Sequence, residues 1–170
     1  AFVDDLGTLG YGQLDQRVRR MATGLRALGM RREERVLLLM QDCNDWPVSF
    51  LGAMYAGLVP VAVNTLLTAD DYAYMLRHSR AQAALVSAAL LPTLQAALAA
   101  SAGEGGHEVR TVVVSRPTGS LPQGAIDFDA FLAANSLAAL IAEAPAAQQP
   151  AAAFHRGAIP AEMVGDLTSL

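Results

Sequence analysis

The residues that could do chemistry in this chain are few and scattered. The single cysteine, Cys43, has no histidine near it in the sequence, and Ser49 lies in an apolar stretch without the glycines of a hydrolase elbow. His78, His107 and His155 lack the spacing of metal ligands. Cys43 is therefore interpreted as a small residue at the end of a strand. We expect neither catalytic nor metal-binding residues within this sequence.

A loop rich in hydroxyl groups and glycine, from Ser115 to Gly124, is superficially similar to a loop that binds phosphate. Gln123 stands where a cation would be needed, and no amphipathic helix follows at once to direct its N-terminus at an anion. All twelve basic residues of the chain are arginines. A Walker-type phosphate loop and a Schiff base both require lysine, so neither can be completed within this sequence. The loop is interpreted as a surface connection between a strand and a helix.

Dinucleotide binding would require a glycine-rich turn after the first buried strand. That strand is predicted over 36–40, and the segment 41–45 that follows it contains no glycine. A stand-alone nucleotide-binding, Rossmann-like module is therefore kept only as an alternative hypothesis.

Residues 46–69 carry no charge, and roughly 20 apolar residues suffice to cross a bilayer. Gly57 suits the residue after a helix, and Pro60 forbids one uninterrupted helix through this run. Asn44 is a candidate cap for the helix that precedes Gly57. The run is therefore predicted to be a helix over 45–56 followed by a strand over 59–63, and no membrane association is expected.

Hydrophobic periodicity predicts that helices and strands alternate along the chain. Further helices are predicted over 12–28, 68–79 and 128–134, and after Ser87 with Leu91, Leu94 and Leu98 on one face; further strands are predicted over 83–86 and 110–115. Thr68 with Asp71 is a variant of the capping box, and Asp127 is a candidate cap. Right-handed connections would give an α/β fold, a parallel sheet with flanking helices on both faces.

Composition agrees with a soluble interior. The 170 residues are 53% hydrophobic and 16% charged, with a net charge of −4, which suits one core. Mild acidity argues against nucleic acid as a partner, and Arg17, Arg19 and Arg20 are interpreted as the solvated face of a helix. One cysteine fits a cytoplasmic location. Residues 1–135 are predicted to form one unit, and 136–170 to be a poorly assigned tail rich in alanine and proline.

Several stretches carry a resemblance to a known family. Residues 8–14 read TLGYGQL, residues 46–64 read WPVSFLGAMYAGLVPVAVN, and residues 65–76 read TLLTADDYAYML. Together they resemble the opening of adenylate-forming acyl-CoA ligases, also called the AMP-binding superfamily. The last stretch is most similar to benzoate–CoA ligases. The resemblance covers about residues 1–135 and implies a partial N-terminal subdomain of the acyl-CoA ligase fold.

What the resemblance implies is a ligase that converts a carboxylate, ATP and CoA to acyl-CoA, AMP and pyrophosphate. Benzoate or a related aromatic acid would be the small-molecule substrate, and ATP, Mg²⁺ and CoA would serve the intact enzyme. The family's phosphate loop and two lysines have no counterparts here. The chain is therefore expected to begin inside the N-terminal domain, to end before the nucleotide-binding half, and to be inactive and without productively bound cofactor by itself.

In the family, the turn after the second strand lies near the channel for the pantetheine arm of CoA. The resemblance thus nominates Asn64, Thr65 and Leu66 as a wall of the substrate pocket; a turn that only connects strand to helix is the alternative. Catalytic and metal-binding residues are predicted to be absent. Self-association through exposed apolar surface is expected, because the subdomains that would cover that surface lie outside the sequence.

Overall fold

A parallel sheet of five strands organises the part of the chain that the computed structural model describes, residues 1–102 and 105–135. The strands of this sheet are β3 (Arg35–Leu39), β4 (Val59–Ala62), β5 (Ala81–Ser87), β6 (Thr111–Ser115) and β7 (Ala125–Asp127). The helices are α1 (Tyr11–Ala27), α2 (Asp45–Tyr55), α3 (Ala69–Ser79), the short 3₁₀ helix η1 (Ala88–Leu90), α4 (Leu91–Ser101) and α5 (Phe128–Ala134). A separate antiparallel hairpin precedes them, made of β1 (Phe2–Asp4) and β2 (Gly7–Leu9).

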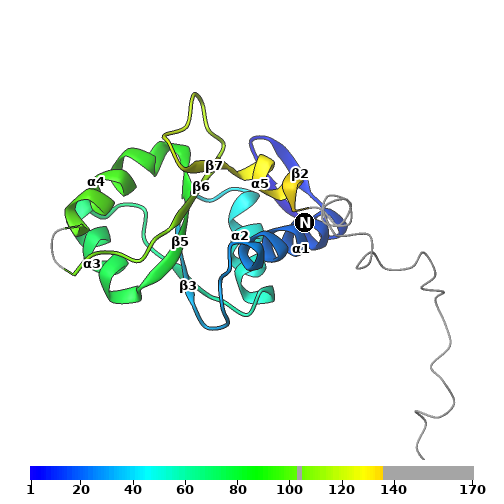
Figure 1. Cartoon of the computed structure of the whole chain (residues 1–170). Helices are drawn as coiled ribbons and strands as arrows, with labels where there is room; N and C mark the ends of the chain where they lie inside the picture. Colours follow the sequence, from blue (N-terminus) through cyan, green and yellow to red (C-terminus); the bar gives the residue numbers. More distant parts are fainter. Residues whose placement is uncertain (103–104, 136–170) are drawn as a thin grey trace, which may run out of the picture.

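The helices cover the sheet from both sides, as the alternating pattern predicts. Figure 1 shows α3 and α4 on one side of the sheet and α1, α2 and α5 on the other. The strand β3 contacts both layers of helices, because its side chains are buried on both faces of the sheet. Val36 and Leu38 pack towards α1 and α2, whereas Leu37 and Leu39 pack towards α3 and α4. Two apolar cores therefore share one sheet.

The strands are ordered β4-β3-β5-β6-β7, and every neighbouring pair is parallel. From β3 the chain passes to β4 on one side and then returns past β3 to β5 on the other. The connection that follows β3 therefore crosses one face of the sheet, and the connection that follows β5, its neighbour, crosses the other. Such a reversal of strand order opens a crevice at the carboxyl ends of the strands in open α/β sheets.

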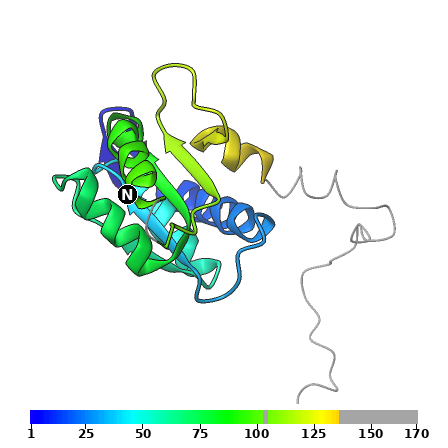
Figure 2. The same ribbon diagram turned by 60° about the vertical axis from the view of Figure 1, so that its left-hand side comes forward.

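Two glycines allow helices to approach closely on the α1 side. A Cβ atom at Gly52 of α2 would lie 2.4 Å from Cγ of Met21 on α1. A Cβ atom at Gly24 of α1 would lie 2.5 Å from Cζ of Phe131 on α5. Figure 2 shows α5 running beside α1. These helices are therefore packed through positions that only glycine fits without a shift.

Most predicted elements are confirmed. The helix and strand bounds agree to within a few residues, and Leu94 is buried with Leu91 and Leu98 packed against the same core. Thr68 and Asp71 form the predicted capping box, and Asp127 accepts a hydrogen bond from the backbone N–H of Ala130.

Two predicted helix caps are wrong. The side chain of Asn44 does not cap α2, because its amide donates to the carbonyl of Gly7 in the hairpin. The hydroxyl of Ser87 does not cap η1, because it accepts a hydrogen bond from the backbone N–H of Gln41 at 2.9 Å. Both side chains are used to tie together segments far apart in the sequence.

Two elements were not predicted, the β1–β2 hairpin and the strand β7. Both are short, and neither carries an alternating apolar pattern; β7 follows the loop 116–124 and extends the sheet beyond the four predicted strands. The opposite edge is β4, where Val59 and Val63 donate their N–H groups to carbonyls of the segment that contains β3. Pro60 lies between them and has no N–H group.

Among the described residues, no helix is both long and apolar enough to cross a membrane. The uncharged run 46–69 is instead divided into α2, β4 and the turn after it, as predicted. The predicted tail, 136–170, lies outside the described residues.

Candidate functional site

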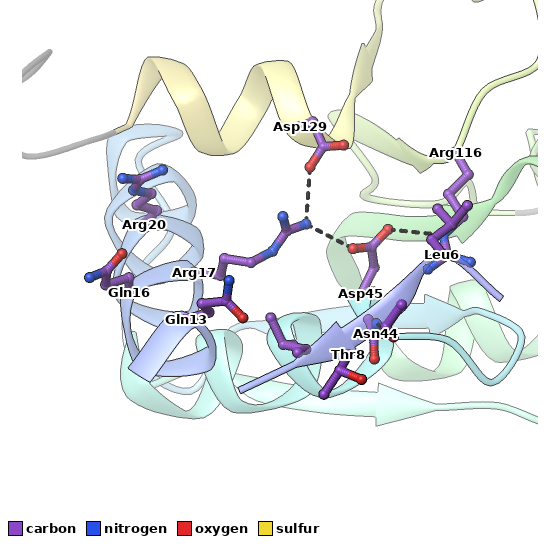
Figure 3. A pocket seen from close by; sticks show the side chains of 12 residues that line it. Leu6, Thr8, Gln13, Gln16, Arg17, Arg20, Asn44, Asp45, Arg116 and Asp129 are labelled. Atoms are coloured by element: carbon purple, nitrogen blue, oxygen red, sulfur yellow. Dashed lines mark hydrogen bonds and ion pairs between the residues drawn. The ribbon is translucent and has the colours of Figure 1, made fainter. Parts of the chain in front are cut away.

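A polar hollow of about 330 Å³ lies where the hairpin, α1, α2 and α5 meet at the carboxyl edge of the sheet. Its walls include Leu6, Gln13, Arg17, Asp45, Arg116 and Asp129. Figure 3 shows Arg17 reaching from α1 between two carboxylates, with Arg116 on the other side of Asp45. The site therefore unites residues from the two ends of the described chain.

Asp45, the first residue of α2, lies in the wall of this hollow, and its side chain is only 8% exposed. Its Oδ1 accepts a hydrogen bond from Nη2 of Arg17 at 2.8 Å, and its Oδ2 accepts one from the hydroxyl of Ser115 at 2.8 Å. Nε of Arg116 lies 3.7 Å from the same Oδ2. A buried carboxylate is tolerated because both oxygens are hydrogen-bonded and two guanidinium groups balance its charge.

Arg17 corrects one prediction. The sequence predicts that it belongs to a solvated helix face, but its guanidinium also contacts Asp129 of α5 at 3.0 Å and lies over the ring of Phe128, 5.7 Å from its centre. The partners are 28 and 112 residues away in the sequence, so no local pattern could indicate them. Arg19 fits the predicted role better, since it forms an exposed pair with Asp15 on the same helix.

Asp4 holds the hairpin against the rest of the molecule. Its carboxylate accepts hydrogen bonds from the backbone N–H of Asn44 at 2.7 Å and from the guanidinium of Arg116. The N–H of Asn44 first, and the Arg116 side chain next, lower the pKa of Asp4 from 3.8 to about 2. We call this contact of Asp4 with Asn44 and Arg116 the hairpin clasp.

Arg116 takes part in both clusters, with Asp4 and with Asp45. Its backbone has a φ of 56°, a left-handed conformation that is unusual for a residue other than glycine. This conformation starts the loop after β6, which was interpreted as a surface connection. The loop does connect β6 to β7, but Arg116 at its start and Ser115 at the end of β6 are also bound into the polar network.

The polar groups of this network are engaged mainly with one another. Asp45 is fully engaged, and the hydroxyl of Ser49 donates to the backbone carbonyl of Asp45 within α2. Cys43 is a free, partly buried thiol without a hydrogen bond to histidine among the described residues. In that part of the chain, no cluster of three or more His, Cys, Asp or Glu could hold a metal ion.

The nominated turn of Asn64, Thr65 and Leu66 lies apart from the polar hollow, after the edge strand β4. Oδ1 of Asn64 accepts a hydrogen bond from the N–H of Leu66, and the carbonyl of Asn64 accepts one from the hydroxyl of Tyr72 at 2.6 Å. The side chain of Leu66 is 89% exposed. The turn is thus anchored from α3 and presents an apolar side chain to the outside.

The family described as AMP-binding enzyme matches residues 1–154, most of the chain. The chain belongs to the AMP-binding enzyme family. This confirms the predicted superfamily.

Two curated relatives of this family member are named for benzoate and 4-hydroxybenzoate. The chain is 48% identical over 92 residues to a benzoate–CoA ligase of Thauera aromatica, and 42% identical over 99 residues to a 4-hydroxybenzoate–CoA/benzoate–CoA ligase of Rhodopseudomonas palustris. These matches cover 54% and 58% of the chain. The chain spans only 18% of the length of each of these relatives.

Solved structures agree with membership of the AMP-binding enzyme family. A benzoate CoA ligase from Burkholderia xenovorans LB400 is 44% identical and superposes with a TM-score of 0.66, over 79% of this chain and 25% of that one. The anthranilate CoA ligase AuaEII is 26% identical with a TM-score of 0.68, over 78% and 24%. This member of the AMP-binding enzyme family thus has the fold of one part of an acyl-CoA ligase.

Proposed function

We propose that this chain is part of an ATP-dependent acyl-CoA ligase that acts on benzoate or a related aromatic carboxylate. The reaction would convert the carboxylate, ATP and CoA to the acyl-CoA thioester, AMP and pyrophosphate. The observation that carries the proposal is the 48% identity to a benzoate–CoA ligase, together with the shared fold at 44% identity to a second one. Relatives named for fatty acids are less similar, at 31% identity.

We further propose that the chain alone does not catalyse this reaction. The described residues do not fit a triphosphate: the sequence has no lysine, and the carboxylates of Asp42 and Asp45, near the start of α2, would repel phosphate groups. The carboxylate of Asp45 is already bound by Arg17 and Ser115. ATP, Mg²⁺ and CoA are therefore proposed to bind mainly to parts of the longer protein.

The turn of Asn64, Thr65 and Leu66 is proposed to form a wall of the pantetheine channel in the whole ligase. Its exposure at the carboxyl edge of the sheet and its anchoring by Tyr72 support this proposal. Replacing Leu66 by Ala in a functional ligase should then raise the KM for CoA more than the KM for the carboxylate.

A chimaera tests the proposed function. The segment of the Thauera aromatica enzyme that matches this chain is replaced by the corresponding residues of this chain, and benzoyl-CoA and AMP are measured with benzoate, ATP and CoA. We expect the chimaera to be active and the 170-residue chain alone to be inactive. A folded but inactive chimaera contradicts the ligase proposal, and turnover by the chain alone contradicts the proposed inactivity.

Calorimetric titration of the chain with ATP and NAD tests the alternative of a stand-alone nucleotide-binding module. Tight binding of either nucleotide would favour that alternative. Weak or no binding is expected, because no glycine-rich turn follows β3 and acidic side chains occupy that position.

A further inference from the structure

A second hollow, distinct from the one around Arg17, lies at the point where the strand order reverses. It has a volume of about 400 Å³ and is formed by the loops that follow β3, β5 and β6. We call it the switch-point crevice. In open α/β sheets, ligands bind in the crevice outside the carboxyl ends of the strands at this reversal. The observed hollow and the topology thus indicate the same place independently.

Two buried serines border the switch-point crevice, and each has hydrogen-bonding capacity left. Ser87, which is 6% exposed, accepts a bond from the N–H of Gln41, so that bond does not use its hydroxyl proton. Ser115, which is 1% exposed, donates its proton to Asp45, so its oxygen can still accept. Buried hydroxyl groups with unused capacity are suited to a ligand that both donates and accepts hydrogen bonds.

Arg116 also lines the crevice; its buried Nε has no hydrogen-bond partner among the described residues and lies 3.7 Å from Oδ2 of Asp45. Its positive charge is already balanced, because its guanidinium binds Asp4 and lies within ion-pair distance of Asp45. Arg116 therefore lines the crevice without offering an uncompensated charge.

The other charged groups of the crevice are acidic. Asp5 of the hairpin turn and Asp42 of the loop after β3 both line it and are exposed. Carboxylates at this position repel phosphate and carboxylate ligands but accept hydrogen bonds from hydroxyl groups. The hydroxyl-rich loop after β6, with Thr118 at the crevice, adds a further neutral partner.

From this lining we propose that the switch-point crevice binds a small, neutral, polyhydroxylated molecule. Hydroxyl groups of the ligand donate to Asp5 or Asp42 and to the oxygen of Ser115, and accept a hydrogen bond from the hydroxyl of Ser87. The volume lies within the range of small-molecule pockets. This site is separate from the proposed ligase function and does not depend on it.

The test is an NMR titration of the ¹⁵N-labelled 170-residue chain with xylitol. 1,5-Pentanediol, which has the same carbon chain without adjacent hydroxyl groups, and inorganic phosphate are titrated in parallel. We expect xylitol to give saturable shifts with a Kd of about 1–10 mM at amides of 41–43, 87–89 and 115–118. 1,5-Pentanediol and phosphate should give no saturable shift at those amides.

Substitutions complete the test. Ser87→Ala should weaken xylitol binding about five-fold, the loss of one hydrogen bond. Ser101→Ala is the matched control, because Ser101 is also buried but bonds within α4, away from the crevice. Thr118→Ala, at an exposed position on the rim of the crevice, is a second variant for the same measurement if Ser87→Ala alters the fold, and it should also weaken xylitol binding.

Three outcomes would overturn the proposal. One is the absence of saturable shifts with xylitol, and another is equal binding of 1,5-pentanediol. The third is tighter binding of phosphate at the same amides, which would make the crevice an anion site instead.

Discussion

Nη2 of Arg17 and Oδ1 of Asp45 lie 2.8 Å apart, and this ion pair joins α1 to the start of α2 beside the sheet. The two partners differ in environment, because the Arg17 side chain is 30% exposed and that of Asp45 only 8%. The same guanidinium also pairs with Asp129, whose side chain is 77% exposed. One arginine therefore provides a buried and an exposed ion pair whose strengths can be compared within one protein.

Asp45→Asn should lower the free energy of unfolding by about 2 kcal/mol, because it leaves two guanidinium groups without their buried anion. Asp129→Asn should change it by less than about 0.5 kcal/mol, because water screens the exposed pair. Urea denaturation, followed by the fluorescence of the single tryptophan, Trp46, measures both. Equal losses would show that burial does not determine the strength of these pairs.

Gly52→Ala should destabilise the fold by about 1–3 kcal/mol, because the new methyl group would overlap Met21 and push α1 away from α2. Gly12→Ala, also in a helix, should instead stabilise it by about 0.5 kcal/mol, because no atom lies within 4 Å of the position of the new Cβ. Thermal unfolding distinguishes the two. A stable Gly52→Ala variant would contradict the close approach of these helices.

The hairpin clasp should fail in acid. The pKa of Asp4 is lowered from 3.8 to about 2, so its ionised form favours the folded state at higher pH. This contribution is complete above about pH 4 to 5, and it is lost as the pH falls to about 2 and below. In the unfolded state Asp4 binds a proton near pH 4, whereas in the folded state it does so only near pH 2.

Asp4→Asn should therefore lower the free energy of unfolding at pH 6 and have a much smaller effect at pH 2, relative to the unchanged chain. Asp5→Asn is the matched control, since Asp5 is the adjacent exposed carboxylate and does not contact Asn44 or Arg116 among the hydrogen bonds described. Urea midpoints at several pH values measure the difference. A difference that stays constant from pH 6 to pH 2 would rule out the clasp as its cause.

Tyr72→Phe should loosen the turn that contains Asn64, Thr65 and Leu66. The hydroxyl of the buried Tyr72 donates to the carbonyl of Asn64 and accepts from the N–H of Leu67 at 3.2 Å. Its loss should lower the free energy of unfolding by about 1–2 kcal/mol. Hydrogen exchange at residues 64–67 should rise as well.

Tyr74→Phe, in the same helix but 59% exposed, is the control and should leave both measurements unchanged. Unchanged exchange in Tyr72→Phe would mean that the turn is held by its own backbone.

Features with local causes were predictable from the sequence. The capping box of Thr68 and Asp71 spans three residues, and the helix and strand of the uncharged run follow from Gly57 and Pro60. The parallel sheet follows from the regular alternation of apolar helices and strands. The family was also predictable, because its residues occur in continuous stretches.

The polar network was not predictable, because its partners are brought together only by the fold. Asn44 and Ser87 have the residue types of helix caps, yet their nearest suitable partners in space are Gly7 and Gln41. Arg17 looks like any surface arginine until α5 and the start of α2 are placed beside it. The short strands β1, β2 and β7 gave no periodic signal of their own.

Pro60 has a consequence for how copies of this chain can meet. The N–H groups of Val59 and Val63 point towards β3, so the alternation of the strand turns the backbone of Pro60 and Ala62 outwards. Because Pro60 has no N–H group, the free edge of β4 lacks one of the backbone donors that an incoming strand would need for continuous pairing. If the exposed side chains of Met54, Tyr55 and Val59 draw two molecules together, the association will be side chain against side chain, and the sheet will not be extended from one molecule into the next.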